Sequence, residues 1–143
     1  MNRNVCYLFI VFFFQACGTT GHLKFYDFST SKYEVEKELL SVINTDSAYS
    51  VPAKWQSHTT GDYFERIYIY FASEPEELYQ IGFTRDSIEW VSSPTCRLGV
   101  ISIYQGDKFL YNSDLSSNEI ERVLNRFEQE ILNKIKYTFY KTD

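Results

Sequence analysis

The chain has 143 residues, of which 44% are hydrophobic and 23% are charged, so it is long enough for one globular domain and too apolar for a disordered chain. Its formal net charge is -5, and its Lys and Arg residues are scattered along the sequence. Because binding to nucleic-acid phosphates depends on clustered basic side chains, we expect no nucleic-acid partner.

The first segment of the chain has the composition of a secretory signal peptide. Arg3 is its only charged residue, and residues 5–14 form an uninterrupted apolar run. A ten-residue helix is about 15 Å long, half the thickness of the hydrocarbon core of a bilayer, so this run is too short to span a membrane. Small residues Ala16 and Gly18 follow, as at a cleavage site. We therefore predict that residues 1–16 are a signal peptide.

The motif FQACG at residues 14–18 resembles the lipobox of bacterial lipoproteins, in which a small residue precedes the cysteine that is diacylated and becomes the mature N-terminus. Ala16 and Cys17 match this pattern, whereas Leu and a small residue are usual at the two positions before them. The resemblance implies lipidation of Cys17 and a protein anchored in the cell envelope, at the outer membrane of a Gram-negative bacterium. Residues 17–24 then form the lipidated cysteine and a short tether. Plain secretion with cleavage after Gly18 stays open as the alternative.

The mature domain is predicted to begin with a short strand or extended arm at residues 23–28, followed by a helix at residues 31–45. Ser31 and Glu34 have the spacing of a capping box. Apolar residues then recur on one helical face: Val35, Leu39, Leu40, Val42 and Ile43. Residues 46–62, rich in Ser and Thr and interrupted by Pro and Gly, predict a loop.

From residue 63 onward the apolar residues recur with a period of two, which is typical of β-strands. Short turns with Ser, Pro, Gly or Asp separate the runs. We predict strands at residues 64–72, 77–84, 87–91, 98–104 and 108–111. Because strands joined by short turns usually pair as neighbours, the pattern predicts an antiparallel meander, with the longest apolar run, at residues 98–104, at the centre of the sheet.

A second helix is predicted to begin near Ser116 and to carry the strongest periodic signal in the chain. Its apolar stripe consists of Ile120, Val123, Leu124, Phe127, Ile131, Leu132 and Ile135. Residues 137–140 either finish this helix or add an edge strand. The sequence therefore predicts one α+β domain over residues 25–143, in which two amphipathic helices pack on one face of a meander sheet of four or five strands.

The sequence offers little for catalysis or for metal binding. His58 is the only histidine outside the tether, so no set of His and Cys ligands is available for zinc, and no phosphate-binding or nucleophile motif is present. We predict no catalytic residue, no metal and no cofactor. Cys96 is the only cysteine that would remain unmodified in the mature protein, and we expect it to be buried and unpaired.

Tyrosines provide a candidate contact surface. In the predicted sheet, Tyr68 and Tyr70 alternate away from the core side, and Trp90 and Tyr104 belong to neighbouring strands. Tyrosine-rich surfaces give a large contact area at a small cost in conformational entropy, which favours a binding surface. Stabilisation of the sheet by cross-strand pairs is the alternative interpretation of the same residues.

These observations predict a lipid-anchored cell-envelope protein that acts as a binding or assembly module. Its expected partners are the membrane, through the lipid anchor, and an envelope protein. Two alternatives stay open: a small envelope hydrolase that uses carboxylates, and a protein that binds a small ligand between the helices and the sheet.

Overall fold

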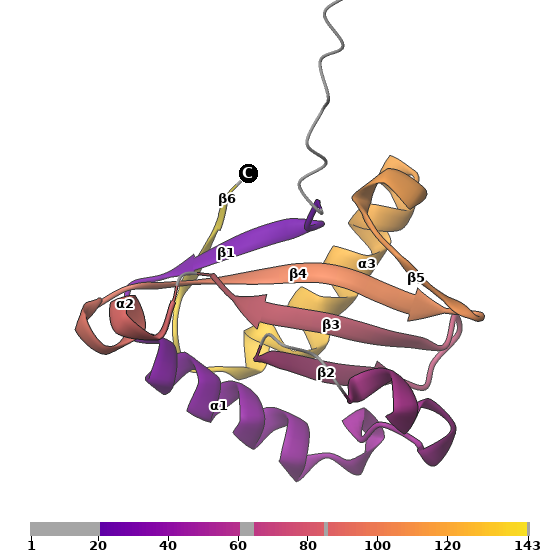
Figure 1. Cartoon of the computed structure of the whole chain (residues 1–143), viewed down its shortest axis with the longest axis horizontal. Coiled ribbons are helices and arrows are strands. Elements are labelled where there is room, and N and C mark those ends of the chain that lie inside the picture. The colour runs from indigo at the N-terminus through magenta and orange to yellow at the C-terminus, as the bar shows by residue number, and fades with distance from the viewer. Residues whose placement is uncertain (1–20, 61–64, 85, 143) are drawn as a thin grey trace, which may run out of the picture.

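The computed structural model describes residues 21–60, 65–84 and 86–142, so the predicted signal peptide and Cys17 lie outside the described residues. The described chain has the predicted α+β fold, with an antiparallel sheet and helices packed on it (Figure 1). The strands are β1 Lys24–Phe28, β2 Arg66–Phe71, β3 Glu77–Phe83, β4 Cys96–Gln105, β5 Lys108–Leu110 and β6 Phe139–Thr142. The helices are α1 Lys32–Thr45, α2 Ser87–Ser92 and α3 Ser117–Glu130, with 3₁₀ turns η1 Ser47–Tyr49, η2 Ala53–Thr59, η3 Asn112–Asp114 and η4 Leu132–Lys134.

The strand order is β2-β3-β4-β1-β6, and β5 pairs with β4 near its end. The predicted meander accounts for β2 to β5, where Gly106, with φ of 69°, makes the turn between β4 and β5. The segments at residues 23–28 and 137–140, whose structure the sequence left open, contribute the strands β1 and β6. The described sheet therefore has six strands. β1 pairs with β4 on one side and with β6 on the other, so Phe28 lies opposite both Cys96 and Phe139.

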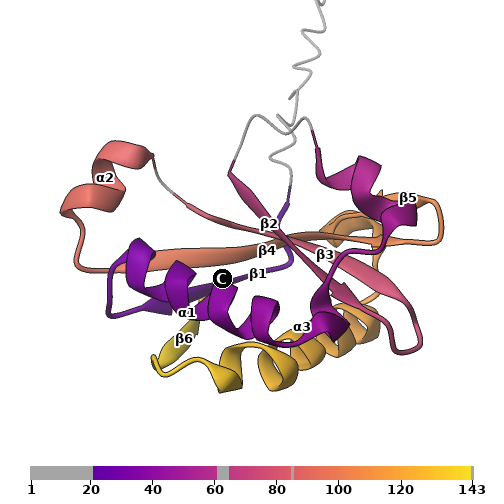
Figure 2. The same cartoon turned by 90° about the horizontal axis from the view of Figure 1, so that it is seen from below.

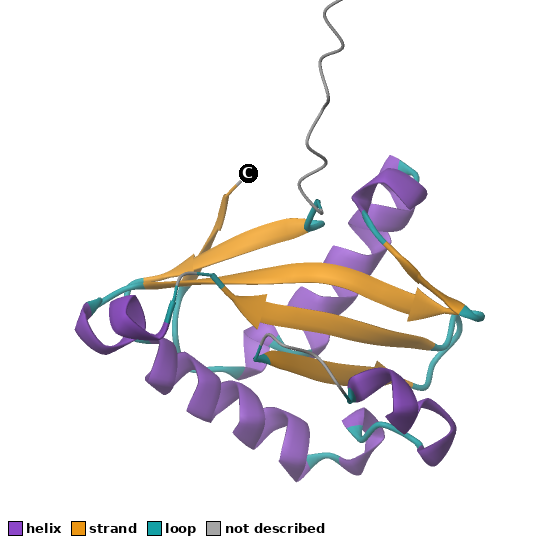
Figure 3. Cartoon of the chain, viewed as in Figure 1, coloured by secondary structure: helices purple, strands orange, loops and turns teal. Residues whose placement is uncertain are grey.

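One predicted strand is wrong. Residues 87–91 belong to the helix α2 in the connection between β3 and β4 (Figure 3). The Oδ1 atom of Asp86 accepts hydrogen bonds from the backbone N–H groups of Ile88 (3.0 Å) and Glu89 (3.1 Å), which caps the first turn. An alternation over only five residues is a weak strand signal, and the cap outweighs it. Trp90 is therefore on a helix and not on the sheet.

Helices α1 and α3 cover the same face of the sheet, as predicted (Figure 2). From α1, Val35, Leu39 and Ile43 are buried, and from α3, Val123 and Phe127. These helical side chains pack on alternate residues of the strands, and both sets together fill the space between the two layers. The strand residues of this main core are Tyr26, Phe28, Ile69, Phe71, Tyr79, Ile81, Leu98, Val100 and Ile103.

Two tyrosines in this core keep their hydroxyl groups satisfied. The Tyr26 hydroxyl donates to Glu128 (2.8 Å), and the Tyr79 hydroxyl donates to the carbonyl oxygen of Val123 (3.2 Å). Burial away from water raises the pKa of both phenols, so they stay neutral donors. Both bonds join the sheet to α3, which fixes how the helix lies on the strands.

The capping box predicted for α1 forms only in part, whereas α3, which begins near Ser116 as predicted, has a complete one. Ser116 Oγ accepts from the backbone N–H of Glu119 (3.4 Å), and the Glu119 carboxylate accepts from the backbone N–H of Ser116 (2.8 Å). Hydrogen bonds from Ser116 hold the pKa of Glu119 below its ordinary value. At α1, Ser31 caps Glu34 in the same way, but the Glu34 carboxylate accepts from the hydroxyl of Tyr137 (2.9 Å).

The α3 capping box gives the first prediction. Replacement Ser116→Ala removes the acceptor for an otherwise unsatisfied N–H and should lower the free energy of unfolding by about 1 kcal/mol. Urea denaturation followed by far-UV circular dichroism measures this change. Ser117→Ala, at the exposed next position, is the matched control and should leave the transition in place. Equal shifts for both variants would contradict a capping role for Ser116.

Candidate functional site

The sheet face away from α1 and α3 is partly covered by the 3₁₀ turn η2. Trp55, only 8% exposed, packs edge-to-face on the rings of Tyr70 (centroids 5.4 Å apart) and Tyr104 (5.5 Å). Leu78 is buried beneath them. This end of the face is therefore a second, smaller core. The segment predicted as a loop, at residues 46–62, covers this second core through η2 and Trp55. In the sequence, only the aromatic Trp55 indicated this role.

The structure brings three of the four predicted contact residues together. Tyr68, Tyr70 and Tyr104 lie in or against the second core, whereas Trp90 lies on α2. Tyr104 is only 7% exposed, and the Tyr68 hydroxyl accepts a hydrogen bond from the side-chain amide of Gln80 (3.0 Å). Packing against neighbours is thus a structural role for these tyrosines, and their use in binding stays a prediction.

At the edge of this second core, the polar side chains of Tyr70, Glu76 and Lys54 bond to one another. The Tyr70 hydroxyl donates to the carboxylate of Glu76, and Lys54 donates to the same carboxylate (2.6 Å). These two hydrogen bonds, with that of Lys54 the larger cause, lower the pKa of Glu76. They fasten η2 to the turn between β2 and β3.

At the other end of the same face the sheet is open, and a shallow cavity of about 270 Å³ lies there. We name it the glycine groove, because Gly82 of β3 and Gly99 of β4 lie opposite each other in its floor. Apolar side chains form its sides, and polar side chains line the rest. Its apolar residues are Phe25, Phe83 and Ile101, and its polar residues are His22, Glu65, Arg66 and Thr84.

The two glycines keep the groove open. A Cβ atom on Gly82 would lie 3.2 Å from Cδ1 of Ile101, and one on Gly99 would lie 3.0 Å from the ring of Phe25. Any larger residue in the floor would push these side chains outward. The sequence shows both glycines inside predicted strands, where glycine often marks a close approach of another group.

A β-bulge directs Ile101 into the groove. Val100 pairs with Ile81, but Ser102 pairs with Gln80, so Ile101 is an extra residue in β4. The extra residue shifts the alternation along β4, which allows Val100 and Ile103 both to reach the main core. Alternation in the sequence cannot reveal such a shift, because it depends on the pairing with β3.

His22 forms one side of the groove and marks where the chain enters the domain. Its imidazole packs on the ring of Phe25, with centroids 3.5 Å apart. Partial burial, helped by the positive charge of Arg97, lowers the pKa of His22, so the groove presents a neutral imidazole at pH 7. Arg97 itself is held by a two-fold hydrogen bond to Asp27 (2.6 and 2.8 Å).

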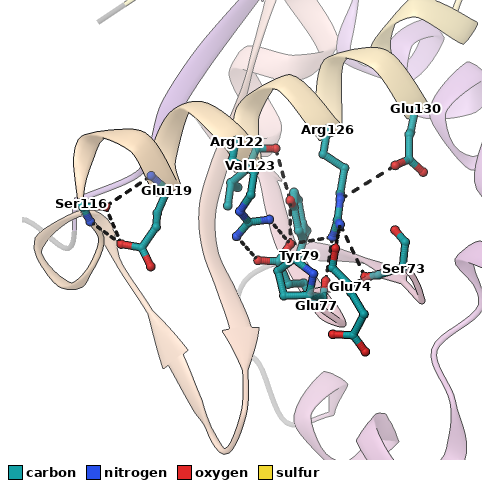
Figure 4. A network of polar contacts seen from close by, with 11 residues as sticks. Ser73, Glu74, Glu77, Tyr79, Ser116, Glu119, Arg122, Val123, Arg126 and Glu130 are labelled. Carbon is teal, nitrogen blue, oxygen red and sulfur yellow. Dashed lines mark hydrogen bonds and ion pairs between the residues drawn. The ribbon is translucent and has the colours of Figure 1, made fainter.

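A second polar cluster, centred on Glu77, lies between β3 and α3 (Figure 4). The fully buried carboxylate of Glu77 accepts hydrogen bonds from Arg122 (2.6 and 3.0 Å), from Arg126 (2.8 Å) and from the hydroxyl of Tyr79 (3.1 Å). Arg126 also donates to the carbonyl oxygen of Pro75 (2.9 Å). The carboxylate has no exposed surface on which a substrate could bind, so the cluster serves to fasten α3 to the sheet.

This cluster gives the second prediction. Glu77→Gln leaves two guanidinium groups around an uncharged amide, and breaking a buried ion pair on one side typically costs about 3–5 kcal/mol of stability. Thermal and urea unfolding should show a loss of that order. Glu121→Gln, at an exposed position on α3, should change stability by less than about 0.5 kcal/mol. If Glu77→Gln lowered stability no more than Glu121→Gln does, the cluster would not fasten α3 to the sheet.

The residues with other chemical potential are dispersed. His58 stacks on Tyr104 (4.2 Å between centroids) near one end of β4, and the buried Cys96 begins β4 at its other end. Within the described ranges, no group of three or more His, Cys, Asp or Glu side chains is arranged to hold a metal ion. Among the described helices, none has the length and apolar character needed to cross a bilayer.

Comparison with known proteins found no matching family model, no significantly similar curated protein and no significantly similar solved structure. The glycine groove is therefore the candidate site on its geometry alone.

Proposed function

We propose that the protein is a lipid-anchored cell-envelope protein whose domain is a binding module, and that the glycine groove holds an apolar group of its partner at the membrane surface. The observation that carries this proposal is the open end of the sheet face away from α1 and α3, where two facing glycines leave a cavity with apolar sides and polar residues around them.

The volume of the groove supports the binding of one apolar group. Small-molecule sites usually enclose about 300–1,000 Å³, and the groove, at about 270 Å³, lies just below that range. Such a cavity suits one large apolar group, as in protein interfaces where an anchoring side chain fills a pocket. The neutral imidazole of His22 and the charged groups of Glu65 and Arg66 would then position the polar atoms next to that group.

The lipid anchor is proposed from the lipobox-like motif. Because His22 lines the groove and follows Cys17 closely in the sequence, the anchor would hold the groove near the membrane. His22 lies five residues after Cys17, and five extended residues span about 17 Å. Two acyl chains hold a small domain durably, because each buried methylene contributes about 0.8 kcal/mol. An acylated Cys17 would therefore keep the groove close to the bilayer surface.

The anchor is tested by intact mass spectrometry of the membrane fraction after expression of the full chain in a Gram-negative host. We expect a mature chain that begins at Cys17 and carries fatty acyl groups. Cys17→Ser should abolish both the acylation and the membrane association. A mature chain that begins at Thr19 without added mass would instead support plain secretion and contradict the anchor.

The groove is tested by site-specific photocrosslinking in membranes. A benzoylphenylalanine at Thr84, beside the groove, should crosslink to a partner, whereas one at Lys37, exposed on α1, should not. Gly82→Leu fills the floor and should reduce the Thr84 crosslink by about tenfold, which corresponds to about 1.4 kcal/mol of binding. Unfolding measurements check that the variant folds, and Gly82→Ala is the milder form if it does not.

Equal crosslinking at Thr84 and Lys37 would contradict the groove as the binding site, and so would an undiminished crosslink in a folded Gly82 variant. Because mass spectrometry reads acylation separately from the crosslink, the anchor and the groove can fail separately.

A further inference from the structure

The short helix α2 exposes two large apolar side chains. Ile88 is 79% exposed and Val91 is 76% exposed, more than any other large hydrophobic residue in the described part of the chain. They are three positions apart in the helix and so lie on the same side. The pair forms a compact apolar tip.

The rest of α2 is firmly held, so the exposure of the tip is not a consequence of a loose segment. Trp90 donates from Nε1 to the carbonyl oxygen of Thr84 (2.8 Å), and the Lys32 ammonium lies 4.5 Å from the centre of the Trp90 ring. Lys32 is itself buried and paired with Glu36 (2.8 Å) and Glu65 (3.2 Å). The inner side of α2 is thereby fixed, and its outer side, with Ile88 and Val91, is exposed.

The helix α2 lies next to the glycine groove and on the same side of the sheet as the point where the chain enters the domain. Thr84, which anchors Trp90, lines the glycine groove together with His22. In Figure 2, α2 and the beginning of β1 both rise on the side of the sheet opposite α1 and α3. An anchor at Cys17, about 17 Å of extended chain from His22, would bring this side toward the bilayer.

We propose that α2 docks on the lipid bilayer, with Ile88 and Val91 inserted at the interface, and so turns the sheet face away from α1 and α3 toward the membrane. This inference rests on the lipid anchor of the proposed function. A bilayer fits the tip better than a protein does, because a specific protein interface covers about 800 Å² on each partner, far more than two side chains supply. A tethered domain needs only weak binding, since the tether keeps the tip at a high effective concentration.

The charge around the tip indicates which lipids matter. Asp86 and Glu89, both exposed, lie on α2 or at its start, and the chain as a whole carries -5. Attraction to anionic lipids requires basic residues near the surface. Docking should therefore depend on the apolar pair, and it should persist on vesicles of zwitterionic lipid.

The test uses the full chain, processed and acylated in a Gram-negative host, then reconstituted into phosphatidylethanolamine–phosphatidylcholine vesicles. With Cys96 buried and Cys17 acylated, Val91→Cys supplies a thiol for an environment-sensitive fluorophore. We expect an aqueous quencher to quench the fluorescence of the label at position 91 about tenfold more slowly than that of a label introduced by Lys37→Cys on α1. Ile88→Asp should abolish this protection without lowering the thermal midpoint, because the side chain is largely exposed.

Leu40→Asp, at an exposed apolar position on α1, is the matched control and should leave the protection unchanged. Equal quenching at positions 91 and 37 in acylated, vesicle-bound protein would overturn the docking of α2 while leaving the anchor intact. Disulfide-linked dimers of unlabelled Val91→Cys on the vesicles would also overturn it, because they would assign the tip to a second copy of the chain. Failure of acylation itself would be seen in the mass spectrum and would refute the proposed function.

Discussion

The pairing of β4 with its neighbours is the constraint on which the rest of this structure depends. β4 is ten residues long, bonds to β3 along one side and to β1 along the other, and continues into the hairpin with β5. Its side chains supply the main core on one face and, through Tyr104, the second core on the other. The bulge at Ile101 shifts the alternation of side chains, so that Val100 and Ile103 both reach the main core while Tyr104 reaches the second core.

The aromatic residues of the domain are mostly used for internal packing. Tyr26 and Tyr79 lie in the main core and bond to α3, while Trp55 and Tyr104 pack together on the opposite face. Because the second core covers one end of the sheet face away from α1 and α3, only the other end of that face is open. The proposed binding site is found where glycines, and not tyrosines, define the surface.

The entry of β1 between β4 and β6 joins the proposed anchor to the proposed site. Since Lys24 pairs with Val100 near the middle of β4, His22 lies over the sheet beside the glycine groove. In the proposed arrangement, the groove and the apolar tip of α2 face the bilayer in which Cys17 is anchored. A partner that contributes an apolar group at the membrane surface is then the one best placed to bind.

The sequence by itself determined the α+β class, both amphipathic helices, and the central position of residues 98–104, because these follow from local periodicity and short turns. It also supplies the motif from which the anchor is proposed. Only the tertiary structure decided that residues 87–91 are helical, that Trp55 covers Tyr70 and Tyr104, and that Gly82 meets Gly99 beside a bulge. These features depend on caps, register and contacts between segments far apart in the chain, which a local pattern of apolar residues does not encode.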